Sequence, residues 1–315
     1  MRSNRKETKG FTRRDFVAGA AAAGAAVAGS SRLAGLAQTG AAQSAGPADS
    51  PFAIFNAYGN DLERVLFLRT YPIAIKMLKS ENEIPKGAVR PKKDRGEHYA
   101  MCQAFAVARR QGMTLAMFLE DHWCFEPIIS YGLVETPQDY KDGFASAFFI
   151  TDKEAARKRG SQMSHLSAGK YPGMVLGPLK TANYVPDLTM IYSNTGQLRH
   201  MLLCLMYNNG YQVTSTLDPI GSCVHSVVPS LLTGECKVTV PDPGDFERGM
   251  AEEDEMILTV PTAKLKELMD GVYHYEKSNR GYKSYGRLIR TDFPQPPFYQ
   301  EYFKKWGLDA PKSTK

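Results

Sequence analysis

The stretch HYAMCQAFAVARRQGMTLAMFLEDHWC, residues 98–124, predicts how this chain folds. Residues 98–112 carry apolar side chains at helical spacing, and they end at Gly112 with two arginines in the last turn. Residues 114–120 then form a short apolar run of strand length. The stretch therefore predicts a helix, a strand, and an acidic turn that contains a cysteine.

The same alternation of helices and strands continues along the chain and predicts an α/β fold, with α+β as the alternative. The predicted strands are 72–78, 114–120, 147–151, 173–179, 187–193, 213–218, 237–241 and 256–261. The predicted helices are 98–112, 153–161, 195–210, 222–232 and 262–273.

Residues 98–124 and 197–223 look alike. A shift of 98 residues places Gly112 on Gly210, and a shift of 99 places Cys124 on Cys223. If this is a repeat, two similar helix–strand halves form one compact domain with a cleft between them. The alternative is that any two helix–strand units look alike at this level.

The first residues have the pattern of an export signal. A basic stretch contains Arg13 and Arg14, followed by an aromatic and an aliphatic residue, as in twin-arginine signals, and then by an Ala/Gly-rich run. An ordinary secretory signal and a membrane anchor are the alternatives, but the run is too short and too weakly apolar to span a bilayer stably. We expect a signal and flank at 1–42, a flexible linker at 43–61, a domain at 62–276, and an irregular aromatic tail at 277–315.

Export changes the charge argument. The chain has a formal net charge of +6, but residues 1–42 hold seven of its 39 basic and two of its 33 acidic side chains, which leaves a balance of +1. Such a chain is a poor match for nucleic acid or anionic lipid. We expect a periplasmic or otherwise exported protein without a stable membrane anchor after cleavage. Its partners would be the twin-arginine translocase and a redox protein.

Five cysteines are too few for a disulfide scaffold of this size, and their odd number leaves at least one thiol free or bound to a ligand. Three of them stand beside polar residues at the ends of predicted elements: Cys102, Cys124 and Cys223. We expect these three to bind a metal or an iron–sulfur cluster. The alternatives are a Cys102–Cys124 disulfide and free structural thiols. The other two cysteines, Cys204 and Cys236, have the apolar settings of core residues.

Histidines accompany the cysteines at suggestive spacings. His98 lies four residues before Cys102 and shares its helix face, and His122 lies two residues before Cys124 in an extended segment. Imidazole and thiolate are the usual zinc ligands, so both histidines are secondary candidates for a metal site. A nucleophilic pair of Cys124 with His98 is a further alternative, with Asp121 or Glu126 orienting the imidazole. We expect the Cys102 and Cys124 sulfurs to lie close enough to share one metal or one disulfide.

Several blocks together resemble the domain-of-unknown-function 169 family: TYPIAIKML, YAMCQAFAVARRQG, LEDHWC, LGPLKTANYVPDLTMIYSNTGQL, SCVHSVVPSLLTGECKVTVPDPGD and EMILTVPTAKLKELMDG. The resemblance covers about Leu62 to Gly271. It implies that the family uses Cys102, Gly112, Cys124, Gly177-Pro178-Leu179, Pro186-Asp187, Cys223 and Gly244. The family's arginine follows that last glycine closely, whereas three residues precede Arg248 here. The resemblance assigns no activity. A small-ligand binding protein with structural cysteines and a thiol-dependent enzyme are the alternatives to a metal-binding redox protein.

Overall fold

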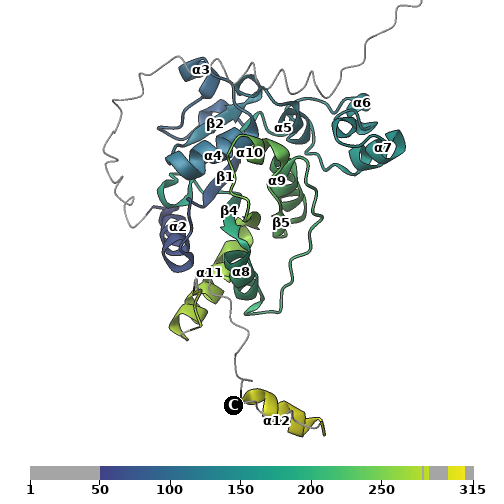
Figure 1. The fold of residues 1–315 in the computed structure, drawn as a ribbon. Coiled ribbons are helices and arrows are strands. Elements are labelled where there is room, and N and C mark those ends of the chain that lie inside the picture. Colours follow the sequence, from purple (N-terminus) through teal and green to yellow (C-terminus); the bar gives the residue numbers. More distant parts are fainter. Residues whose placement is uncertain (1–49, 279, 284–296, 309–315) are drawn as a thin grey trace, which may run out of the picture. The chain divides into compact units, whose positions relative to one another are not determined.

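A computed structural model describes residues 50–278, 280–283 and 297–308 (Figure 1). Arg13 and Arg14 lie outside these residues. The strands are β1 (Ile73–Leu78), β2 (Leu115–Phe118), β3 (Gly173–Pro178), β4 (Leu188–Asn194), β5 (Lys237–Thr239) and β6 (Glu255–Pro261). The α-helices are α2 (Ala53–Leu66), α3 (Pro91–Arg95), α4 (Met101–Gln111), α5 (Phe125–Ser130), α6 (Gln138–Lys141), α7 (Lys153–Gln162), α8 (Thr195–Met206), α9 (Ser222–Thr233), α10 (Pro243–Glu247), α11 (Thr262–Lys277) and α12 (Phe298–Lys305). Short 3₁₀ helices are η1 (Glu81–Glu83), η2 (Leu119–Asp121), η3 (Ser146–Phe148) and η4 (Leu179–Thr181).

The six strands form one sheet in the order β2-β3-β1-β4-β6-β5, and each neighbouring pair is antiparallel. The longest pairing joins β4 to β6, from Leu188 opposite Pro261 to Asn194 opposite Glu255. The mixture of helices and strands confirms the predicted fold class, and the antiparallel pairing matches the α+β alternative.

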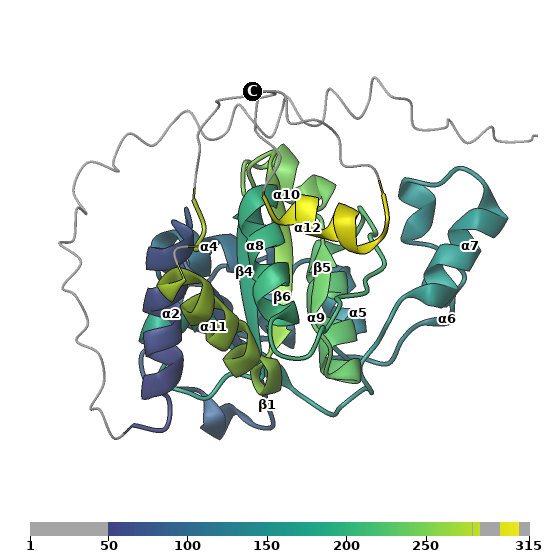
Figure 2. The same ribbon diagram turned by 90° about the horizontal axis from the view of Figure 1, so that it is seen from below.

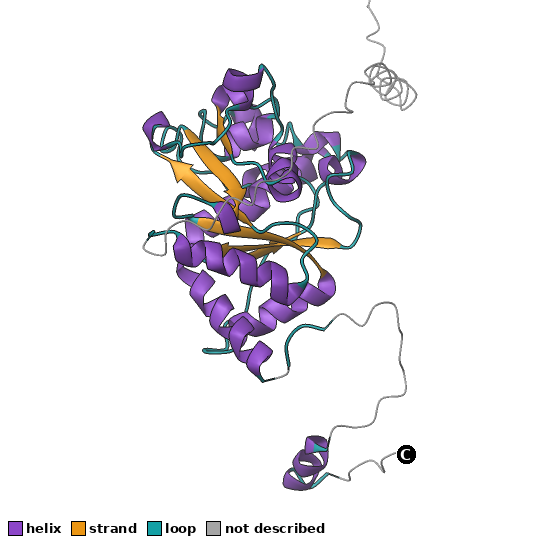
Figure 3. Cartoon of the chain, turned by 90° about the vertical axis from the view of Figure 1, so that its left-hand side faces the viewer, coloured by secondary structure: helices purple, strands orange, loops and turns teal. Residues whose placement is uncertain are grey.

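Helices cover both faces of this sheet (Figure 3). Alternate residues of a strand point to opposite faces, so Ile73 and Ile75 pack with α4, α5 and α9, whereas Ala74 and Leu78 pack with α2, α8 and α11. Figure 2 shows the second group of helices together. Burial on both faces explains why the strands read as continuous apolar runs.

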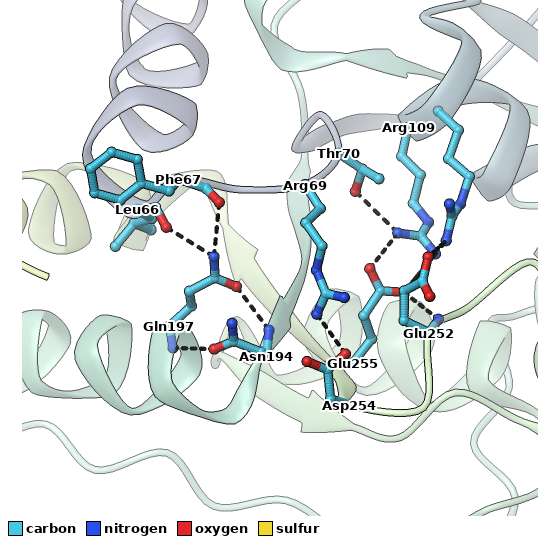
Figure 4. A network of polar contacts seen from close by, with 11 residues as sticks. Leu66, Phe67, Arg69, Thr70, Arg109, Asn194, Gln197, Glu252, Asp254 and Glu255 are labelled. Atoms are coloured by element: carbon cyan, nitrogen blue, oxygen red, sulfur yellow. Dashed lines mark hydrogen bonds and ion pairs between the residues drawn. The ribbon is translucent and has the colours of Figure 1, made fainter. Parts of the chain in front are cut away.

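Two buried polar networks hold the helices in place, one between two helices on the same face of the sheet and one between a helix and a strand (Figure 4). Gln197, near the start of α8, donates its side-chain amide to the carbonyls of Leu66 and Phe67 at the end of α2. On α4, Arg109 forms a bidentate ion pair with Glu255 of β6, in which Nη1 and Nη2 lie 2.9 and 2.8 Å from the two carboxylate oxygens. Its guanidinium also lies 3.8 Å from the centre of the Tyr192 ring. The end of helix α4 is thereby fixed to β6 and β4.

Helix α2 begins inside the segment expected to be a flexible linker, so residues 53–61 correct that boundary. The helix lies directly against η4, because a Cβ on Gly59 would come within 2.5 Å of the Lys180 backbone nitrogen. The Asn56 side chain donates to the carbonyls of Leu179 and Ala182 at 2.9 Å. These contacts stabilise residues 53–61 as part of α2, although they follow a segment rich in small residues. Likewise, the tail expected to be irregular contains α12.

Two predicted strands are wrong. Residues 147–151 hold the end of η3, where Phe148 and Phe149 are exposed and have no sheet to join. Residues 213–218 pair with no strand, and Leu217, the apolar residue that should anchor them, is exposed. Strand-like composition alone does not form a strand when the segment pairs with no neighbouring strand and only part of it, such as Val213, packs against the core.

The predicted repeat is wrong because its second half lacks a strand. Residues 213–218 are irregular where the first half has β2, and α4 and α8 pack on opposite faces of the sheet. The expected cleft between two similar halves is therefore absent from the described residues. Among the helices in those same ranges, none is long and apolar enough to cross a bilayer.

The buried ion pair makes a direct prediction about stability. Replacing Glu255 with the neutral Gln should leave the buried Arg109 guanidinium without its paired negative charge. This should lower the free energy of unfolding by about 3–5 kcal/mol. Urea unfolding followed by circular dichroism measures this. The control is Glu276→Gln, which removes an exposed partner of Arg64 and should cost no more than about 1 kcal/mol. Equal effects of the two changes would contradict the buried role of Arg109.

Candidate functional site

The three cysteines predicted to act together come from three separate elements and meet in one region. Cys102 is the second residue of α4, Cys124 directly precedes α5, and Cys223 is the second residue of α9. The electrostatic neighbours of the Cys223 thiol include both other cysteines, and those of Cys102 include Cys124. All five cysteines of the chain are free thiols in this structure, so the alternative Cys102–Cys124 disulfide is not formed.

A single β-bridge brings Cys102 and Cys124 together. The backbone nitrogen of Tyr99 donates to the carbonyl of Asp121 at 2.8 Å, and that of Trp123 donates to the Tyr99 carbonyl at 3.3 Å. The segment before α4 thus runs beside the segment after β2. Cys102 and Cys124 then follow within three residues of the bridge on each side.

Helix α10 lies over Cys102. A Cβ built on Gly244 would come within 3.9 Å of the Cys102 sulfur, 3.1 Å of an Asp242 oxygen and 3.3 Å of the Arg248 guanidinium. A side chain at position 244 would therefore come close to Asp242 and Arg248 and touch Cys102 at ordinary contact distance. This close approach gives a physical reason for a glycine at this position. The Arg248 guanidinium also lies 5.7 Å from the centre of the Trp123 ring, so this arginine reaches the same region despite its later place in the sequence.

Two aspartates of this helix connect it to the third cysteine. The Ser222 hydroxyl lies 2.8 Å from an Asp245 oxygen and 3.1 Å from an Asp242 oxygen, and the Ser222 backbone nitrogen donates to Asp242 at 3.0 Å. Burial, followed by the neighbouring Asp242, raises the pKa of Asp245 to about 6. Because Ser222 directly precedes Cys223, these bonds fix the first turn of α9 beneath α10.

Further buried polar groups surround the thiols. The Tyr131 hydroxyl donates to the Cys223 carbonyl at 2.8 Å, and Tyr140 donates its hydroxyl to the Glu126 carboxylate. Burial raises the pKa of Glu126, although Tyr140 and Arg159 oppose this shift. The thiols therefore share their region with three carboxyl groups.

Burial dominates the acidity of the thiols. It raises the pKa of Cys102 to about 12, with further contributions from Asp245 and Asp242, and it raises that of Cys124 to about 11. It also raises the pKa of Cys223 well above the ordinary thiol value. Arg248 opposes the shift at Cys124 but does not outweigh it. The three thiols are thus protonated at neutral pH in the ligand-free chain.

The two candidate histidines are not joined to the thiols. His98 is exposed on the approach to α4. His122 is buried, its pKa is lowered to about 4 by that burial, and neither ring nitrogen has a hydrogen-bond partner. Trp123, which stands between His122 and Cys124 in the sequence, is 53% exposed. Across the described ranges, no group of three or more His, Cys, Asp or Glu side chains is arranged to hold a metal ion.

Sequence reasoning missed the acidic partners of the thiols, Asp242 and Asp245, together with Ser222. A signal for them was present in Asp242-Pro243-Gly244-Asp245, because Asp followed by Pro is typical of the start of a helix and a second acid three residues on completes a capping box. The proximity of that helix to Cys102 is a tertiary contact that no local pattern indicates.

The raised pKa values predict slow alkylation. A thiol with a pKa of about 11 holds roughly a hundredfold less thiolate at pH 8 than a free cysteine does, and iodoacetamide reacts with the thiolate. Mass spectrometry of the native chain should show Cys124 alkylated slowly at pH 8 and faster only above about pH 10. Because its folded pKa lies above the unfolded value, the neutral thiol stabilises the fold below about pH 8.5, and this contribution is lost as the pH rises toward 11. Alkylation of native Cys124 at the rate of the unfolded chain would contradict the assignment.

Comparison with known proteins identifies one family. The model of DUF169, described as "Uncharacterised ArCR, COG2043", matches residues 61–271. No curated protein and no solved structure matches the chain. The matched segment contains Cys102, Cys124 and Cys223, the Tyr99–His122 bridge and α10. Since the match covers more than half of the sequence, the chain belongs to the DUF169 family.

Proposed function

We propose that the chain binds a soft metal ion or an iron–sulfur cluster through Cys102, Cys124 and Cys223. In this role it would support electron transfer or an accompanying oxidoreductase. The observation that carries the proposal is the convergence of three thiols from three elements, beside carboxyl groups, in a largely buried region. The two remaining cysteines, Cys204 and Cys236, pack in the core on the other face of the sheet and take no part.

The charge of the region supports a cationic ligand. Asp242 and Asp245 raise the pKa of Cys102, and Asp242 and Glu126 raise that of Cys223. These groups oppose one another's ionisation when no cation is present. A bound metal ion would reverse this relation, because it stabilises thiolates directly.

The arrangement of the side chains sets a condition on this binding. Since no three candidate ligands are arranged around one point in the described residues, the thiols must lose their protons and rotate before they share an ion. Metal binding would therefore release protons and tighten as the pH rises. The rival function, a small-ligand binding protein with structural cysteines, requires neither change.

Export through the twin-arginine pathway completes the proposal. Arg13-Arg14 and the Ala/Gly-rich run that follows carry it. This pathway translocates folded proteins, so a cofactor acquired before export would be retained. The partners would then be the translocase during export and a redox protein in the periplasm or an equivalent exported location.

Metal content tests the cofactor. Protein purified without oxygen should contain about one metal ion or one cluster per chain, and iron would add absorbance from thiolate-to-metal charge transfer. Changing Cys124 to Ser should lower the metal content by about tenfold or more, since it removes a direct ligand. Elemental analysis of matched preparations measures this.

Cys204→Ala and Cys236→Ala are the matched controls, because they remove thiols from the opposite core and should leave the metal content unchanged. Wild-type protein without metal, or a Cys124→Ser variant with the wild-type content, would contradict the proposal.

Export has its own test. Changing Arg13 and Arg14 together to Lys should retain the precursor inside the cell, because the pathway recognises the guanidinium pair rather than charge alone. Cell fractionation and immunoblotting measure the distribution. As a control, changing Arg2 and Arg5 to Lys leaves Arg13 and Arg14 intact and should not affect export. Normal export of the Arg13/Arg14 variant would exclude the pathway.

A further inference from the structure

A cavity of about 420 Å³ lies between α7, α9, β5 and the irregular segment 213–218. Its size is that of a pocket for a small metabolite. None of the three clustered cysteines lines it. Cys223 and His225 are two residues apart on α9 and so point to roughly opposite sides of the helix, with Cys223 among the thiols and His225 in the cavity wall. The cavity is therefore a separate site.

One wall of the cavity contains a bidentate ion pair between Arg159 and Asp218. Arg159 donates from Nε and Nη2 to the two oxygens of Asp218, at 2.8 and 3.1 Å, and His225 Nε2 lies 3.3 Å from the same carboxylate. Burial alone would raise the pKa of Asp218, but the hydrogen bonds from His225 and Arg159 hold it below its ordinary value. Arg159 also donates to the Ile220 carbonyl and to the Ser146 hydroxyl. The charges of Arg159 and Asp218 hold this wall in place and satisfy one another.

The opposite wall offers unused donors. The ammonium of Lys237 has three N–H bonds, and its one hydrogen bond, at 3.1 Å, goes to the carbonyl of Thr214. Ser215 accepts a hydrogen bond from the Val238 nitrogen at 2.7 Å, which leaves its own O–H to donate. Thr216 and Gln162 line the same space. The lining therefore combines the Lys237 ammonium with the hydroxyl-bearing residues Ser215 and Thr216, while its carboxylate, Asp218, is already paired with Arg159.

We propose that this cavity binds a small polyhydroxylated monocarboxylate. Lys237 would pair with the ligand carboxylate, and Ser215 and Thr216 would hydrogen-bond to its hydroxyl oxygens. A single available ammonium matches one carboxylate better than a dianionic phosphate, whose usual sites contain arginine clusters or backbone N–H groups. This proposal does not depend on metal binding by the thiols.

Isothermal titration calorimetry of the mature chain tests the proposal, with D-gluconate as the probe. Sorbitol, an uncharged polyol of similar size, and inorganic phosphate are the comparison ligands. Gluconate should bind saturably at one site and at least about tenfold more tightly than either, because it alone offers both a single carboxylate and hydroxyl groups.

Lys237→Gln should weaken gluconate binding by about tenfold or more, and Thr216→Val should weaken it without removing a charge. Lys266→Gln is the matched control, since Lys266 lies exposed on α11 and pairs with Asp270. Cys102→Ser should bind as the wild type does, which separates this site from the thiols. Circular dichroism establishes that each variant is folded. The proposal would be overturned if gluconate shows no saturable binding up to about 10 mM, or if sorbitol binds equally well or phosphate binds more tightly. Wild-type gluconate affinity in folded Lys237→Gln would overturn it as well.

Discussion

The buried carboxylate of Asp121 holds together the segments from which the thiol region is built. It is completely buried, and it accepts hydrogen bonds from the Arg90 guanidinium at 2.8 Å and from the backbone nitrogens of Lys92 and Phe118 at 2.9 Å. Its own carbonyl accepts the Tyr99 nitrogen that forms the bridge. One residue thus joins the start of α3, the end of β2 and the approach to α4. Both oxygens of the Asp121 carboxylate are hydrogen-bonded, and this favours one arrangement of the segments because losing any of these bonds would leave a buried charge poorly compensated.

The positions of the cysteines follow from this junction and from the sheet. Helix α4 starts near the end of β2 because of the bridge, and Arg109 at the other end of α4 holds the helix on β6. Helix α9 packs on the same face, and Ser222 fastens its first turn to α10. Cys102 and Cys223 therefore approach each other from two helices that the fold fixes independently. The thiol region is a consequence of several tertiary contacts rather than of one local motif.

Sequence patterns correctly predicted the strands and helices in which apolar residues extend along the whole element. Strands β1, β3, β4 and β6 are buried on both faces and gave unambiguous runs, and α4 gave a helical period closed by Gly112. Residues 213–218 were wrongly predicted as a strand because Val, Ser and Leu at every second position have the composition of a strand. In the structure, the Ser215 hydroxyl instead accepts a hydrogen bond from the backbone nitrogen of Val238 in β5. The grouping of the cysteines was predictable from their places at element ends. Their carboxylate neighbours were not, because Asp242 is separated from Cys102 by 140 positions in the chain.

Metal binding requires that Cys102, Cys124 and Cys223 share one ligand. Diffraction from crystals of the protein, grown and kept without oxygen, would locate their three sulfur atoms by anomalous scattering. We expect each pair of sulfurs to lie less than about 5 Å apart if the thiolates share one ion, because the metal–sulfur bond is about 2.3 Å. Around an iron–sulfur cluster the sulfurs would lie somewhat farther apart, because each thiolate binds a different iron. Separations beyond about 8 Å would contradict the proposal, since no single ion could then reach the thiols.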